Sequence, residues 1–334
     1  MIQWCFYLLF FLVPLVFYSG SHELFDYNKM MLTYALTIVD AAAWAIKGVK
    51  NFRRTPLDIP IALYLTSHLL STLFSLDPHT SLWGYYSRFH EGLLATISYI
   101  ILYYAAVSNL TRQHVLNILK VSFVSAVIVS IYGTFEHFGA SPSCLFITGN
   151  FNVDCWVQDV KNRVFATLGQ PNWMAAYLDV LILISLGFVR KFEIRNLKFT
   201  IIPALLFASL LFTKSRSGLL GLFAGVAVFG FFQLKSIKNF WKIAAAFLII
   251  IAIFRLPFTQ IEKLSLESFL TQKPSLVNRE PVPTVNPGYI DVGISESGDI
   301  RRIVWQGAIK VWQRYPIFGS GVETFAYAYY KDRP

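Results

Sequence analysis

Apolar residues in this chain come in blocks of about 16–22, the length of a membrane-crossing helix, and this spacing constrains the fold more than any other feature. A helix rises 1.5 Å per residue, so about 20 apolar residues cross the hydrocarbon core of a bilayer. The composition agrees, because 55% of the 334 residues are hydrophobic and the mean hydropathy is +0.51. The sequence therefore predicts an all-α, polytopic α-helical membrane protein.

About nine transmembrane helices are expected. Their ranges are 2–18, 30–46, 57–76, 92–108, 118–138, 172–189, 199–213, 217–234 and 241–256. The first block lacks the basic stretch of a signal peptide, so it is interpreted as a retained span. Residues 1–256 then form a transmembrane bundle. Residues 257–334 form an extracytoplasmic loop region with an amphipathic helix, which is incomplete because the C-terminal spans are missing.

Positive charge separates the loops into two sets. One set, expected to be cytoplasmic by the positive-inside rule, carries Lys47, Lys50, Arg53, Arg54, Arg112, Lys120, Arg190, Lys191, Arg195, Lys198, Lys235, Lys238 and Lys242. The other set carries, before residue 257, only Lys29, Arg88, Lys161, Arg163, Lys214 and Arg216. The N-terminus is then cytoplasmic. The net charge of +10 reflects membrane orientation, and no basic stripe interleaved with aromatics indicates nucleic acid.

Lys214 and Arg216 interrupt the apolar run 199–234 and lie in a short loop of the extracytoplasmic set. One interpretation is that both side chains snorkel to anionic lipid headgroups. The other is an anion site at the outer surface, built from the two cations and a helix N-terminus that begins near Ser217. In the second interpretation Arg301 or Arg302 joins Arg216 around one anion, since arginine suits bidentate phosphate contacts.

The remaining extracytoplasmic segments offer further candidates. Cys144 and Cys155 share the loop 139–171 and can pair if it faces an oxidising compartment. Asn172 is expected as the N-cap of the next span, with a role in lining a substrate groove beside Gln170 as the alternative. The pair Glu136-His137 at the outer end of its span is either functional or solvated.

An amphipathic helix is expected near the end of the chain, because Trp305, Ala308, Ile309 and Trp312 recur at helical spacing. It is interpreted as a surface helix in the headgroup layer. The six histidines show no metal-ligand spacing and no nucleotide-binding loop is present, so neither a metal nor a cofactor is expected.

Three segments together resemble the O-antigen ligase and O-antigen polymerase family of bacterial envelope glycosyltransferases. The first runs from Gly169 to Leu178 and is similar to a Gly-x-Pro-Asn-x-x-Ala motif. The second, Thr213 to Gly218, is similar to a Ser-Arg-Ser/Gly motif. The third runs from Arg301 through Pro316, Phe318, Gly319 and Gly321 to Phe325. Order and spacing agree from about 165 to 325, while the earlier spans agree only in hydropathy.

The resemblance implies a metal-independent, inverting glycosyltransferase in the bacterial cytoplasmic (inner) membrane, with its active face extracytoplasmic. Its donor would be a glycan linked to a polyprenyl diphosphate such as undecaprenyl diphosphate, in lipopolysaccharide or other surface polysaccharide biosynthesis. Its acceptor would be a hydroxyl on a glycan, lipid or protein. Family arginines that match Arg216 and Arg301 imply diphosphate binding, with Lys214 and Arg302 beside them.

The family pattern places a histidine further along the same outer loop. No histidine follows His137 before Pro334 in this chain, so the expected catalytic histidine lies beyond Pro334 and the sequence is interpreted as a fragment. Within the chain, only Glu296, Asp299 and Glu323 offer a substitute base. Two other functions stay open: a polysaccharide or small-anion transporter, and a non-catalytic subunit of a glycan-assembly complex. The clustering of cations at one face favours surface chemistry over transport.

Overall fold

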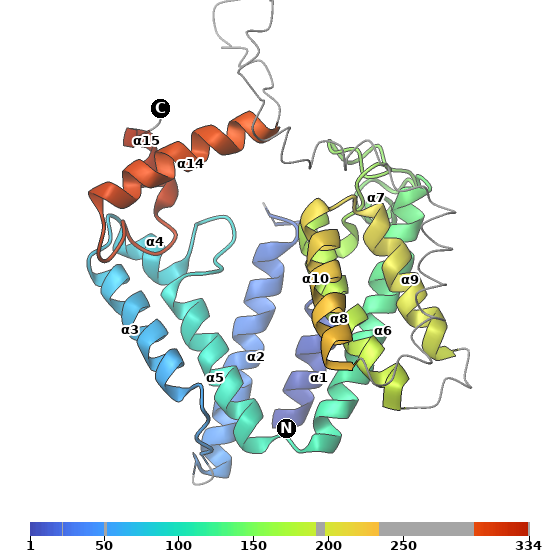
Figure 1. The fold of residues 1–334 in the computed structure, drawn as a ribbon, viewed down its shortest axis with the longest axis horizontal. Helices are drawn as coiled ribbons and strands as arrows, with labels where there is room; N and C mark the ends of the chain where they lie inside the picture. The colour runs from blue at the N-terminus through green and yellow to red at the C-terminus, as the bar shows by residue number, and fades with distance from the viewer. Residues whose placement is uncertain (22, 50–51, 192–197, 234–296, 333–334) are drawn as a thin grey trace, which may run out of the picture.

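The computed structural model describes the chain except for residues 22, 50–51, 192–197, 234–296 and 333–334, and every regular element in the described part is a helix (Figure 1). The long helices are α1 (Ile2–Leu12), α2 (Asp26–Lys47), α3 (Asp58–Leu73), α5 (Leu93–Asn109), α6 (Arg112–His137), α8 (Pro171–Lys191), α9 (Lys198–Phe212), α10 (Arg216–Gln233) and α14 (Ser297–Arg314). The short ones are α4 (Pro78–Trp83), α7 (Pro142–Thr148), η2 (Ala166–Leu168) and α15 (Phe325–Asp332). The all-α prediction is confirmed.

Eight long helices, α1 to α10 without the short α4 and α7, run up and down in one bundle (Figure 1). Its main apolar core lies between α6, α8, α9 and α10, and a second cluster joins α1, α2 and α5. The helices α4, α7, α14 and α15 all lie at one end, called here the upper end. The connections after α2 and α5 lie at the opposite end. Where the structure describes them, the loops of the two charge sets occupy opposite ends of the bundle.

Helix lengths agree with most of the expected spans. By length and composition, α2 and α6 are apolar enough to cross a membrane, and α1, α5, α8, α9 and α10 are shorter apolar helices. Each of the first eight expected spans overlaps one of the long helices. The ninth, 241–256, lies outside the described residues, as do Glu296 and the side chains of Asp299 and Arg301.

The first span is helical over a shorter range than predicted, because α1 ends at Leu12 and Pro14 follows. Proline has no backbone N–H and clashes with the preceding turn, so a helix seldom continues through it. The freed carbonyls find other donors. The Thr167 hydroxyl donates to the carbonyl of Pro14 at 2.7 Å, and Lys29 Nζ donates to those of Val16 at 2.5 Å and Thr167 at 2.7 Å. The backbone carbonyl groups of Pro14 and Val16 are thus hydrogen-bonded inside the protein.

The expected amphipathic helix is α14, and it lies across the upper end of the bundle (Figure 1). The apolar stripe of the sequence does not pack on the protein: Trp305, Ile309 and Trp312 are 70%, 51% and 63% exposed. A different face packs, because Val311 is buried and Gly307 lies so close to Tyr329 of α15 that a Cβ would collide with its ring. A helix with an outward apolar stripe fits the headgroup layer of a membrane.

This placement predicts a difference between two faces of α14. An environment-sensitive fluorophore on Ile309→Cys should show a blue-shifted, water-excluded spectrum in lipid vesicles. The same label on Lys310→Cys, on the polar face, should report water. Cys5 is buried and the other two cysteines are paired, so neither should compete for label. Identical spectra at the two positions would contradict the interfacial placement.

Candidate active site

The N-terminus of α10 is built by the segment Thr213 to Gly218. Ser215 is the N-cap, because its hydroxyl oxygen accepts the backbone N–H of Gly218 at 3.1 Å. The Thr213 hydroxyl oxygen accepts the N–H of Ser215 at 3.2 Å, and Lys214 takes the left-handed backbone conformation (φ +47°). The helix therefore begins at Arg216, one residue earlier than expected, and its positive dipole end lies at the upper end of the bundle.

A side-chain hydrogen bond ties this cap to the next helix. The Ser215 hydroxyl donates to Asn172 Oδ1 at 2.9 Å. The expectation that Asn172 caps its own span is wrong. Helix α8 begins at Pro171, and the carbonyl of Gln170 accepts the first two backbone N–H groups, from Trp173 and Met174, both at 3.1 Å. The Asn172 side chain is free to reach α10, and the exposed Gln170 makes the turn into α8.

Backbone contact between α8 and α10 reinforces this link. A Cβ on Gly218 would lie 2.5 Å from the Cβ of Ala175, so only glycine lets the two helices approach this closely. Both residues belong to the motifs that carry the family resemblance. The first and second motifs are therefore two halves of one helix–helix junction, which the sequence did not reveal.

The cations near this junction differ in their exposure and in their partners. Arg216 is exposed, as is Arg302 on α14. The partly buried Lys214 donates to Asn162 Oδ1 in the outer loop. Within the described residues α10 packs on α8 and α9, whereas α14 packs on α15. A shared anion site of Arg216 with Arg301 or Arg302 thus stays a prediction.

The outer loop between α6 and α8 contacts the segment before α10, where the N–H of Val164 donates to the carbonyl of Phe212 at 3.2 Å. Cys144 and Cys155 form a disulfide with a Cα–Cα distance of 5.5 Å, so the expected pairing is confirmed. Glu136 is fully buried and not solvated: it accepts the Ser141 hydroxyl at 3.1 Å and the N–H of Ala166 at 2.8 Å. Its role in the described structure is to anchor this loop.

The third motif docks on the opposite side of the upper end. The carbonyl of Ser320 accepts the N–H of Leu76 at 2.9 Å, and the carbonyl of Val322 accepts the Ser81 hydroxyl at 2.8 Å. Gly321 has φ +116° and is crowded by Ser75, so no other residue fits there. The motif thus fastens the segment after α14 to the connection between α3 and α4.

Between these two regions lies Arg88, in the loop that joins α4 to α5. Its guanidinium lies over the ring of Trp173, 5.6 Å from the ring centroid, and its Nε is 3.8 Å from Asp26 Oδ2. His90 Nε2 approaches the same carboxylate oxygen at 3.9 Å. Arg88 therefore connects the first motif, through Trp173, to the loop that precedes α5.

Next to His90, two carboxylates from distant parts of the sequence meet. Ligand atoms of His90, Glu91 and Glu323 all lie within 4.8 Å of one another, a spacing at which they could hold a divalent cation. Burial, and then the hydrogen bond with Glu91, raises the pKa of Glu323. Glu323 is among the substitute bases expected from the sequence, whereas Glu91 is not. No local signal joins them, because the loop that precedes α5 and the segment that follows α14 are far apart in sequence.

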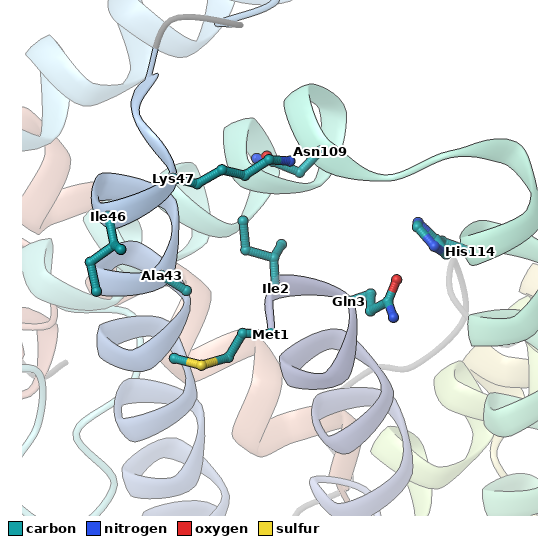
Figure 2. A pocket seen from close by; sticks show the side chains of 8 residues that line it. All are labelled: Met1, Ile2, Gln3, Ala43, Ile46, Lys47, Asn109 and His114. Atoms are coloured by element: carbon teal, nitrogen blue, oxygen red, sulfur yellow. The ribbon is translucent and has the colours of Figure 1, made fainter.

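Two cavities are lined by residues that the structure describes. One, of about 570 Å³, contains both carboxylates in its wall and is lined by Ile61, Tyr64, His68, Glu91, Thr96, Tyr99, Ile100, Tyr103, Val322 and Glu323. The other, of about 390 Å³, is lined by Met1, Ile2, Gln3, Ala43, Ile46, Lys47, Asn109 and His114 (Figure 2). The second cavity surrounds the N-terminus, at the far end of the bundle from Arg216.

A comparison with protein families finds one match in the C-terminal part of the chain. Residues 201–334 match the family model described as O-antigen ligase. This match supports the resemblance of the chain to the O-antigen ligase and O-antigen polymerase family. No curated protein and no solved structure matches it. The matched range contains the second and third motifs, and the first motif lies before it but is bonded to the second.

Members of the O-antigen ligase family are glycosyltransferase-like proteins of the bacterial inner membrane that act in surface polysaccharide biosynthesis. Their substrates are glycans and lipid-linked molecules, in a membrane context. The helical membrane character of the chain and the residues of the matched segment agree with this similarity.

The junction of α8 and α10 gives a stability prediction. Gly218→Ala should lower the melting temperature of the purified protein in detergent, because its methyl group collides with Ala175 and overpacking costs about 1–3 kcal/mol. Gly230→Ala on the same helix is the matched control, since no atom lies within 4 Å of its added Cβ. That variant should melt at or above the wild-type temperature. A reversed order of the two melting temperatures would contradict the close packing.

Proposed function

We propose that the chain transfers a glycan from a polyprenyl diphosphate to a hydroxyl acceptor at the extracytoplasmic face of the inner membrane. The observation that carries this proposal is the junction of the first two motifs. The Ser215–Asn172 hydrogen bond fixes the start of α10. Arg216 follows Ser215 and is exposed, and Lys214 directly precedes Ser215. A helix N-terminus with two adjacent cations is suited to bind a diphosphate.

The transfer of a glycan from a diphosphate requires fixed positive charge beside the departing phosphate group. As the bond between the anomeric carbon and the diphosphate breaks, negative charge grows on the departing phosphate oxygen. Donors that are already positioned stabilise that charge without reorganising. The guanidinium of Arg216 and the backbone N–H groups of the first turn of α10 provide such donors, and Arg301 and Arg302 are proposed to close on the same diphosphate from α14.

The proposed step is a direct displacement. The acceptor oxygen forms a bond to the anomeric carbon, the bond to the diphosphate breaks, and the configuration at that carbon inverts. The polyprenyl diphosphate leaves with the electron pair, and a base accepts the proton of the acceptor hydroxyl. In this scheme the arginines supply the positive charge, so no metal is required.

Two observations support an extracytoplasmic position of this site. The Cys144–Cys155 disulfide lies in the loop above α8 and α10, and disulfides persist in oxidising compartments. The opposite end of the bundle carries the loops rich in Lys and Arg, which the positive-inside rule assigns to the cytoplasm.

The donor site predicts a loss of activity on mutation. Arg216→Ala in the full-length gene product should abolish surface glycan assembly in cells, by at least about 100-fold, because the diphosphate loses a charged donor. Arg216→Lys should fail too if the bidentate contact matters. Arg163→Ala, which removes an exposed cation from the same end, is the control and should remain active. Normal glycan assembly in Arg216→Ala would refute the donor site.

The orientation gives a separate prediction. A cysteine at the exposed position Ser217 should react with a membrane-impermeant maleimide in cells whose outer membrane has been permeabilised. A cysteine at the exposed Gln113, at the opposite end, should react only after the inner membrane is also opened. The reverse pattern of labelling would place Arg216 in the cytosol and exclude the proposed reaction there.

A further inference from the structure

The smaller cavity, of about 390 Å³, lies where four helices meet at the end of the bundle opposite to the upper end. The start of α1 and the last turns of α2 line it together with the last residue of α5 and with His114 of α6. The loop after α2 is held against α5, because the N–H of Arg53 donates to the Ser108 hydroxyl oxygen at 3.2 Å and the Phe52 ring stacks on Tyr104. The cavity is therefore part of the folded structure.

Two side chains of this cavity are oriented as donors of hydrogen bonds. Lys47 Nζ donates to Asn109 Oδ1 at 3.0 Å, and Asn109 Nδ2 donates to the carbonyl of Ala105 at 3.0 Å, so the amide holds the ammonium group in place. An ammonium group has three donors, so within the described residues two of them stay for a ligand. His114 Nδ1 accepts the N–H of Thr111 at 3.3 Å, so the neutral ring has its proton on Nε2 and donates from there.

The charge of this cavity is positive, because none of the residues that line it is acidic. Figure 2 shows Lys47 with Asn109 on one side and Gln3 with His114 on another. Asp40, on the same helix as Lys47, is buried within the bundle and is not a lining residue. An ammonium group among neutral donors attracts an anion and provides charged and neutral hydrogen bonds to the oxygens of a phosphate.

An exposed apolar stripe on α2 leads along the helix into this cavity. Its members are all exposed and recur at helical spacing, so they share one face: Ala35, Ile38, Val39, Ala42, Ala45 and Ile46. Ile46, the last of them, is 86% exposed and also lines the cavity. From residue 35 to residue 46 the helix rises roughly 16 Å, at 1.5 Å per residue. This is about half of the roughly 30 Å hydrocarbon core of a bilayer, so the stripe extends over one leaflet.

The connection to a cation distinguishes this stripe from the other exposed apolar surfaces of the bundle. Exposed apolar side chains also occur on α10, at Leu220, Phe223, Val228 and Phe231, as expected for a helix that faces lipid. These residues line neither of the two cavities. On α2 an apolar surface one leaflet long ends at an oriented ammonium group, which is the arrangement of an acyl chain and a phosphate in a phospholipid.

We propose that this cavity binds the phosphate group of one anionic phospholipid, with an acyl chain along the α2 stripe. Lys47 Nζ and His114 Nε2 donate to the phosphate oxygens, in a basic pocket between membrane helices of the kind that holds anionic headgroups. A polyprenyl carrier fits less well, because its chain is much longer than the stripe. The site is independent of the proposed glycan transfer, since it lies at the far end of the bundle from Arg216. Because four helices contribute to it, the bound lipid stabilises the place where they meet.

The test measures lipid binding to the purified protein in detergent by native mass spectrometry. The probes are dioleoyl phosphatidylglycerol, which is anionic, and dioleoyl phosphatidylethanolamine, which has no net charge. Wild type should bind one phosphatidylglycerol about five-fold more tightly, the preference that one lysine gives for an anionic lipid. Lys47→Met keeps the length of the side chain and removes its charge, so it should lose this preference. Lys120→Met removes an exposed lysine of α6 that does not line the cavity, and this control should bind both lipids as wild type does.

Gln3→Trp provides a second variant in case Lys47→Met folds poorly. It fills the cavity and leaves Lys47 in place, and it should weaken phosphatidylglycerol binding to the level of Lys47→Met. Unchanged phosphatidylglycerol binding in either variant, or equal binding of the two lipids by wild type, overturns the site. Equally tight binding of undecaprenyl phosphate that Lys47→Met loses overturns it too, because the cavity would then hold a polyprenyl carrier. Displacement of phosphatidylglycerol by inorganic phosphate at the same concentration does so as well, because the stripe would then contribute nothing.

Discussion

The hydrogen bond from Ser215 to Asn172 is the interaction on which the upper end of this protein depends. It joins the cap of α10 to the first turn of α8. The same serine oxygen accepts the backbone N–H of Gly218, whose missing side chain lets α10 lie against Ala175. One hydroxyl therefore orients the helix dipole, sets the helix–helix distance and determines where Arg216 emerges.

Hydropathy and helix-terminus chemistry were sufficient for much of the fold. The lengths of the apolar blocks predicted the eight long helices of the described bundle, and the charge bias of the loops predicted which loops share an end. The errors come from specific side chains. Pro14 ends α1 early, and Asn172 bonds across to α10 instead of capping α8. Periodicity found α14 but not its packing face, which is chosen by the contact of Gly307 with Tyr329.

The candidate site was only half predictable. Lys214 and Arg216 stand out in sequence because cations are rare within an apolar run. Glu91 and Glu323 do not, because acidic residues in loops are common and their meeting depends on the docking of Gly321 beside Ser75. The sequence places Arg88 only in a charge set, although its guanidinium lies over Trp173 of the first motif and beside Asp26. Residues that are brought together only by tertiary contacts cannot be recognised from local sequence patterns.

The packing of Gly321 against Ser75 has a consequence for the biogenesis of the protein. The wall that contributes Glu323 is among the last parts of this sequence to be translated, whereas Glu91 and the tyrosine-bearing helices enter the membrane early. Until the ribosome has passed the glycine pair after Pro316, the two carboxylates are not neighbours. A chain that is cut before this glycine pair would thus keep the Ser215–Asn172 junction but lack the meeting of Glu91 with Glu323.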